Sequence, residues 1–315
     1  MRALLLVLTV CLGCPEATSA PVDDTLPYEP FNGGVDTGAE DPTAVPSPAA
    51  DAGCEADAPG ERLACHFAAR ARRAMPDADV SIVGDDLIRI DGQEMALDPL
   101  RAICERDEDS CSERMDEWIA ALAEAREAER TPARAEQLRP VLKHRAFVDA
   151  VRESSPELGS LARPFVGDVH VMLVVDFPRV TRALTPEDLA ALHMSAEQAH
   201  ARAVANLREH HGDLPIEPMP NGLRVMGPTD GYAAARLLLL DRWADAAGGG
   251  ELLVAPSNRD LVLLGDSEHL QALQEAAFRA HRYVDHPITE ALWRYTPEGW
   301  VVHTPPAEAD ADQST

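Results

Sequence analysis

Residues 169–177 read VHVMLVVDF, a run in which β-branched and large apolar side chains dominate. Such a run is typical of a strand that is buried on both faces of a sheet. We therefore expect the central strand of the main sheet here. Asp176 lies at its end, and a polar side chain in that place is a candidate for ligand binding.

The chain downstream of this strand alternates between hairpins and helices. Short apolar segments separated by turn-forming residues predict three hairpins, at 216–226, 252–264 and 292–303. Helices are expected at 195–209, which opens with the capping box formed by Ser195 and Gln198, at 232–246 and at 267–282. This alternation predicts an α+β fold with helices on a largely antiparallel sheet rather than a doubly wound parallel one.

Upstream, residues 61–135 predict a smaller α-β-β-β-α-α subdomain, and residues 136–303 form the larger C-terminal subdomain. Leu63, Phe67, Ala71 and Met75 recur at four-residue spacing, which indicates the first helix. Three short strands are expected between residues 80 and 97. Two helices follow, one opening at residues 98–99 and one spanning 112–130.

Residues 1–20 have the features of an export signal. One arginine precedes an apolar run from residue 3 to residue 13, which is too short to span a membrane as a mature helix. Leu12-Gly13-Cys14 resembles the lipobox of bacterial lipoproteins, which predicts Cys14 as a lipidated first residue. Cleavage after Ala20 is the alternative. We expect a membrane-anchored lipoprotein of the bacterial cell envelope, either periplasmic or surface-facing.

Acidic segments flank the two subdomains. Residues 21–60 are rich in proline and lack lysine and arginine, so we expect a disordered stalk, and residues 304–315 form a second acidic tail. The 315-residue chain has a net charge of −26, of which about half belongs to these segments. Such a charge argues against a nucleic-acid partner, because binding to phosphate needs a basic surface.

Four cysteines remain after the signal. An even number in an exported chain indicates disulfides. Pairing each cysteine with its nearest neighbour predicts Cys54–Cys65 and Cys104–Cys111, although four cysteines also allow two other connectivities. A metal site built from all four is the rival hypothesis, but no Cys-x-x-Cys pair exists in the body.

Known cofactor and catalytic motifs are missing from the sequence. The only lysine is Lys143, so no phosphate-binding loop ends in Gly-Lys-Ser/Thr, and no HExxH or GxSxG segment occurs. We therefore expect neither a bound metal nor a cofactor.

Two polar clusters interrupt apolar runs and are the best site candidates. The first comprises Asp230, Gly231, Tyr232 and Arg236, where a helix N-terminus and a bidentate arginine could hold an anion. The alternative is that Asp230 caps the helix and Gly231 permits a tight turn. The second cluster is Asn258-Arg259-Asp260, for which turn chemistry is the alternative.

Several of these segments carry a resemblance to one bacterial family, the YtpQ-like proteins or domain of unknown function 1444. The similar segments are Arg139-Pro140-Val141, Pro164-Phe165, Val175-Asp176, Asn206-Leu207-Arg208, Asp230-Gly231-Tyr232 with Arg236-Leu237, Val254 and Pro256 with Arg259-Asp260, and Pro287-Ile288-Thr289. The resemblance covers roughly residues 61–303. It implies an α+β body and no established activity.

These observations favour a non-enzymatic binding module. The expected anchor, the stalk and the lack of a recognised catalytic arrangement point to a body that binds a protein, a peptide or a small ligand. The alternative is a hydrolase or transferase of unrecognised type, with a site around Asp230, Tyr232, Arg236, Arg259 and Asp260.

Overall fold

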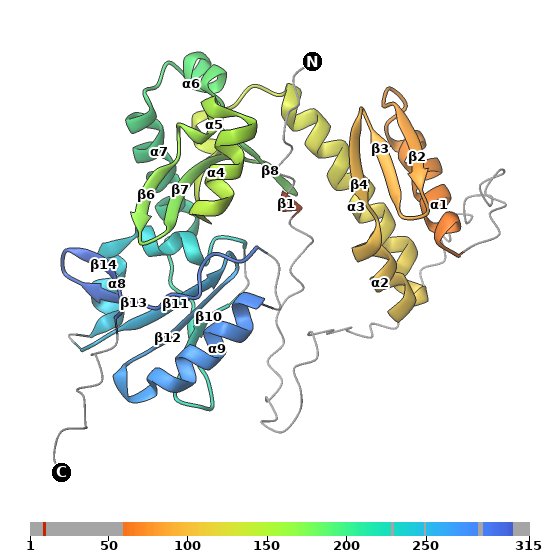
Figure 1. The fold of residues 1–315 in the computed structure, drawn as a ribbon. Coiled ribbons are helices and arrows are strands. Elements are labelled where there is room, and N and C mark those ends of the chain that lie inside the picture. Colours follow the sequence, from red (N-terminus) through yellow and green to blue (C-terminus); the bar gives the residue numbers. More distant parts are fainter. Residues whose placement is uncertain (1–8, 11–58, 228–229, 249, 283–285, 305–315) are drawn as a thin grey trace, which may run out of the picture. The chain divides into compact units, whose positions relative to one another are not determined.

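The computed structural model describes residues 9–10, 59–227, 230–248, 250–282 and 286–304 (Figure 1). They fall into two compact units, one of residues 59–131 and one of residues 132–304 together with β1 (Thr9–Val10). The expected lipidation site Cys14, the stalk as far as residue 58 and the tail from residue 305 lie outside the described residues. Within the described segments, no helix is both long and apolar enough to cross a bilayer.

The unit of residues 59–131 has the predicted α-β-β-β-α-α order. Its elements are α1 (Pro59–Ala74), β2 (Val80–Gly84), β3 (Leu87–Ile90), β4 (Gln93–Ala96), α2 (Asp98–Arg106) and α3 (Glu108–Arg130). The three strands form an antiparallel sheet in sequence order. Phe67, Ala71 and Met75 of the predicted four-residue repeat are buried, and α1 packs against β2 and α3.

The predicted Cys104–Cys111 disulfide is present in this unit, with a sequence separation of 7. We expected it to close a loop before a helix starting at residue 112, and that boundary was wrong. Only Asp107 separates α2 from α3, because its side chain accepts a hydrogen bond from the Ser110 amide and caps α3 earlier. The disulfide therefore links two successive helices. Cys65 is also disulfide-bonded, and its expected partner Cys54 lies outside the described residues.

The first sheet of the larger unit is built around β7 (Val169–Asp176), which confirms the predicted central strand. One edge of β7 pairs with β5 (Leu138–His144), and the other pairs with β6 (Arg163–Val166) and β8 (Val180–Ala183), all antiparallel. Strand β1, which belongs to the predicted export signal, pairs with the outer edge of β8.

The second sheet contains the three predicted hairpins. They are β9 (Ile216–Pro218) with β10 (Arg224–Met226), β11 (Leu253–Asn258) with β12 (Leu261–Gly265), and β13 (Trp293–Thr296) with β14 (Gly299–Val302). The strand order is β14-β13-β11-β12-β10-β9, and every pairing is antiparallel. Helix α9 (Leu270–Arg282) lies across β11 and β12 (Figure 1).

Helices cover the first sheet on both faces. The remaining helical elements are η1 (Ala135–Gln137), α4 (Arg145–Ser154), α5 (Pro156–Gly159), α6 (Pro186–Leu192), α7 (Ala196–His211), η2 (Ala234–Leu238), α8 (Leu240–Ala247) and η3 (Ser267–His269). Val148 and Val151 of α4 pack with Val141 and Met172, whereas α7 packs with Leu138, Leu173 and Val175. Because side chains alternate along a strand, these two sets of strand residues lie on opposite faces, and Leu207 of α7 also reaches the cluster that contains α4.

The expectation of one continuous helix over residues 232–246 was wrong. The chain instead forms the 3₁₀ turn η2 and then α8, and Leu239 between them has non-helical dihedrals (φ −92°, ψ 62°). The Trp243 indole N–H donates to the Arg236 carbonyl at 2.8 Å, so the break is stabilised by a buried side chain.

Candidate functional site

The first polar cluster folds into a closed ion-pair network at the start of η2. Arg236 donates to both carboxylate oxygens of Asp230, at 2.9 and 2.5 Å, and His211 Nδ1 lies 2.7 Å from Asp230 Oδ2. Asp230 Oδ1 also accepts the Tyr232 amide at 3.0 Å. Gly231 has φ +78°, which allows the tight turn that brings these groups together.

These contacts occupy the polar atoms of Asp230 and Arg236, the residues that the sequence indicates as candidates for ligand binding. Burial raises the pKa of the Asp230 carboxyl, but hydrogen bonds from Arg236 and His211 outweigh it and hold the pKa well below its usual range. Arg236 is 4% exposed, and its Nε donates to the Asp213 carbonyl at 2.9 Å. The arginine is therefore the partner of Asp230 rather than a clamp for an external anion.

Asp176 lies next to this network, at the end of β7. Burial raises the pKa of its carboxyl, opposed by a hydrogen bond from Tyr232 and by the charge of Arg139, whose Nε lies 3.8 Å from Asp176 Oδ2. The Tyr232 ring is 4.7 Å from the His211 ring, centroid to centroid. Tyr232 thus joins Asp176 to the Asp230 network.

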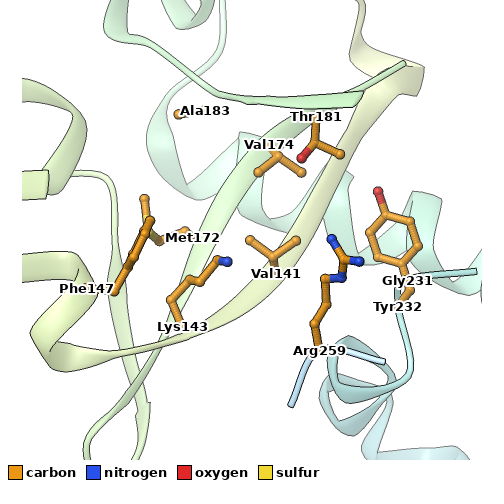
Figure 2. A pocket seen from close by; sticks show the side chains of 10 residues that line it. All are labelled: Val141, Lys143, Phe147, Met172, Val174, Thr181, Ala183, Gly231, Tyr232 and Arg259. Atoms are coloured by element: carbon orange, nitrogen blue, oxygen red, sulfur yellow. The ribbon is translucent and has the colours of Figure 1, made fainter. Parts of the chain in front are cut away.

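The second polar cluster forms the turn between β11 and β12. Asn258 Oδ1 accepts the Asp260 amide at 2.8 Å, as turn chemistry predicts. Arg259 donates from Nε and Nη2 to the two carboxylate oxygens of Asp260, at 2.9 and 3.1 Å. The turn thereby directs the Arg259 guanidinium toward the first sheet, beside Tyr232 (Figure 2).

A pocket lies where this turn meets the face of the first sheet that α4 covers. Its cavity volume is about 30 Å³, and the wider gap between its walls, about 530 Å³, includes open solvent. Figure 2 shows Lys143 and Val141 of β5 facing Arg259 and Tyr232 across it. Its walls are Val141, Lys143, Phe147, Met172, Val174, Thr181, Ala183, Gly231, Tyr232 and Arg259.

Lys143, the only lysine of the chain, brings an amine into this apolar pocket. Its Nζ lies 4.9 Å from the centroid of the Phe147 ring. Burial and the nearby Arg259 charge lower the pKa of the amine to about 8, although the Asp260 charge opposes them. Among the residues that the structure describes, no hydrogen bond or ion pair reaches this amine.

The structure brings together some of the predicted site residues and not others. Gly231, Tyr232 and Arg259 line the pocket, whereas Asp176, Asp230, Arg236, Asn258 and Asp260 do not. Sequence reasoning missed Lys143, Phe147 and His211. A lone lysine inside the mostly apolar segment LRPVLKH was the one available signal. In the described part of the chain, no group of three histidine, cysteine or acidic residues is arranged to hold a metal ion.

Comparisons with protein-family models, with curated proteins and with solved structures gave no match for this chain.

Proposed function

We propose that this protein is a binding module and that the pocket between β5, Phe147, Tyr232 and Arg259 receives a short amphipathic carboxylate. The observation that carries the proposal is that two cationic side chains, Lys143 and Arg259, line a pocket whose other walls are largely apolar. Ligand sites commonly combine an apolar lining with a few polar groups that fix the orientation of the ligand.

The charges of the pocket favour an anionic head group. Arg259 has a carboxylate partner in Asp260, but the Lys143 amine makes no ion pair among the described residues. A buried charge is costly unless it is paired. A carboxylate beside Lys143 would supply that pair, while a short alkyl chain would contact Val141, Met172 and Val174.

Binding is favoured over hydrolysis or group transfer because two acidic residues beside the pocket walls, Asp230 and Asp260, are already paired. Asp230 is bound by Arg236 and His211, and Asp260 by Arg259. The Asp230 carboxyl, whose pKa these partners hold well below its usual range, is a weak general base at neutral pH. The Lys143 amine, in contrast, forms no ion pair with any described residue.

Titration with sodium hexanoate tests this proposal. We expect hexanoate to raise the melting temperature of the native chain, since a ligand that binds only the folded state stabilises it. It should do so much less in Lys143→Met, which keeps the apolar stem and removes the amine. Hexanol, which lacks the carboxylate, is the matched control ligand. An equal effect of hexanoate on the native chain and on Lys143→Met would contradict the proposal.

We also propose that the protein is attached to a membrane through Cys14, as its lipobox-like segment and acidic stalk suggest. The Cys104–Cys111 disulfide is compatible with an extracellular location. Labelling cells with an alkyne analogue of palmitate should mark the native protein and leave Cys14→Ser unlabelled. Equal labelling of the two proteins would refute the anchor.

A further inference from the structure

We propose that Lys143 is a nucleophilic amine that captures small apolar aldehydes in this pocket as a reversible imine. This inference rests on the proposed function only in requiring that the pocket admits a small ligand. It adds a covalent step and a second class of ligand, the aldehyde.

The surroundings of Lys143 match those of lysines that act as nucleophiles. Such amines are desolvated in apolar pockets or lie beside another cation. Lys143 meets both conditions, because Val141, Met172 and Phe147 provide apolar walls and Arg259 lies across the pocket (Figure 2). Among the described residues, no acidic side chain forms an ion pair with the amine to hold it protonated.

The groups around the amine favour its neutral form. Burial and Arg259 lower its pKa to about 8, and Asp260 acts in the opposite direction. About a quarter of the amine is then neutral at pH 7.5, against about one in a thousand for an ordinary lysine. His170 of β7 lies directly opposite Lys143 in the strand register. Its imidazole therefore belongs to the same face of the sheet.

The chemistry balances without an oxidant, a reductant or a cofactor. The nitrogen lone pair attacks the aldehyde carbon, and the carbonyl oxygen becomes a hydroxyl after proton transfer from nitrogen. This carbinolamine then loses water to leave a carbon–nitrogen double bond. Water reverses both steps and releases the aldehyde. His170 Nδ1 is buried and has no hydrogen-bond partner among the described residues.

The chain offers few amines that could react with an aldehyde. Lys143 is the only lysine, so an amine adduct can form only there or at the amino group that begins the purified chain. That terminal amine has an ordinary pKa of about 7.7–8.0, close to that of Lys143. The two amines therefore have similar neutral fractions, and any difference in labelling reports the pocket rather than the pKa.

The experiment treats the full purified chain with hexanal and sodium cyanoborohydride at pH 7.5. Reduction of the imine adds the mass of hexanal less one oxygen atom. Trypsin cannot cleave after a modified lysine, so the adduct is found on the peptide of residues 135–145. Formaldehyde is the matched control reagent, because it forms the same bond without an apolar chain.

We expect hexanal to label Lys143 at least several-fold faster than the terminal amine, and formaldehyde to label the two at similar rates. Lys143→Arg, which keeps the positive charge, should lose the adduct on residues 135–145 and keep the terminal one. The proposal is overturned if hexanal labels Lys143 no faster than the terminal amine, or if the labelling rate of Lys143 keeps rising up to about pH 10, as the neutral fraction of an ordinary lysine does.

Hexanoate separates this inference from the proposed function. If hexanoate raises the melting temperature but hexanal gives no adduct at Lys143, the carboxylate site stands and the imine is refuted. If hexanal labels Lys143 selectively but hexanoate neither binds nor slows the labelling, the imine stands and the carboxylate proposal falls. Inhibition of labelling by hexanoate would support both.

Discussion

Arg236 and Asp230 form a bidentate ion pair inside the larger unit, with N–O distances of 2.9 and 2.5 Å and only 4% of Arg236 exposed. His211 contacts the same carboxylate from the end of α7. The Asp230 carboxylate therefore joins the turn before η2 to η2 itself through Arg236 and to α7 through His211. Because Gly231 and Tyr232 belong to that turn, the ion pair also sets one wall of the pocket.

Asp230→Asn should destabilise the larger unit strongly. The substitution leaves the buried guanidinium of Arg236 without its counter-charge, which typically costs about 3–5 kcal/mol. Urea unfolding followed by tryptophan fluorescence measures the effect, since Trp243, Trp293 and Trp300 belong to this unit. Asp241→Asn is the matched control, because Asp241 pairs with Arg208 on the surface. A similar loss of stability in both variants would contradict this account of Asp230.

The contribution of the same carboxylate should depend on pH. Its pKa is held below the unfolded value of about 4, so the stabilisation is complete above pH 4 and is lost as the pH falls toward the folded pKa. The difference in unfolding free energy between the native chain and Asp230→Asn should therefore shrink below about pH 4. Denaturant titrations at pH 7, 5, 4 and 3 check this. A difference that stays constant over that range would rule out the titration of Asp230 as its source.

The sequence predicted the elements whose local signals are strong. The capping box at Ser195 and Gln198 starts α7, and the three hairpins and the Cys104–Cys111 disulfide formed as expected. Strand β5 was missed because Pro140 and Lys143 interrupt its apolar pattern. Proline is accommodated there since β5 is an edge strand, whose outer side needs no backbone donor.

The site was predicted only in part because its geometry depends on contacts between distant segments. Asp230 and Arg236 are close in sequence, but His211 reaches them from the preceding helix, and Lys143 meets Arg259 only through the packing of two sheets. No local pattern marks either contact. The same limit explains the predicted helix over 232–246, because its break depends on the hydrogen bond from Trp243 to the Arg236 carbonyl.

Arg259→Gln should make the Lys143 amine less reactive at neutral pH. Removing a nearby positive charge favours the protonated amine, so the pKa of Lys143 should rise above 8. Asp260→Asn removes the opposing charge and should lower this pKa. The pH dependence of hexanal labelling on the peptide of residues 135–145 gives both values. Shifts of the same sign in the two variants would contradict the electrostatic account of the pocket.

Lys143→Met should stabilise the protein near neutral pH. The folded pKa of about 8 lies below the unfolded value of about 10.4, so the protonated amine destabilises the folded state relative to the unfolded state. Allowing for solvent screening, the gain should be about 2 kcal/mol at pH 7. Between pH 8 and pH 10 the native chain should recover this difference, because the unfolded state then binds more protons. Lys143→Arg, whose charge persists throughout, should show no such recovery.

Replacing Cys104 and Cys111 together by alanine should destabilise the unit of residues 59–131. A disulfide that closes a loop of this length restricts the unfolded chain by about 2.5 kcal/mol. The bond itself can be verified by trypsin, which cuts after Arg101, Arg106 and Arg114. Without reductant, the peptides 102–106 and 107–114 should run as one linked species, and reductant should separate them. Two separate peptides in unreduced protein from an oxidising compartment would show that the cysteines are not paired there.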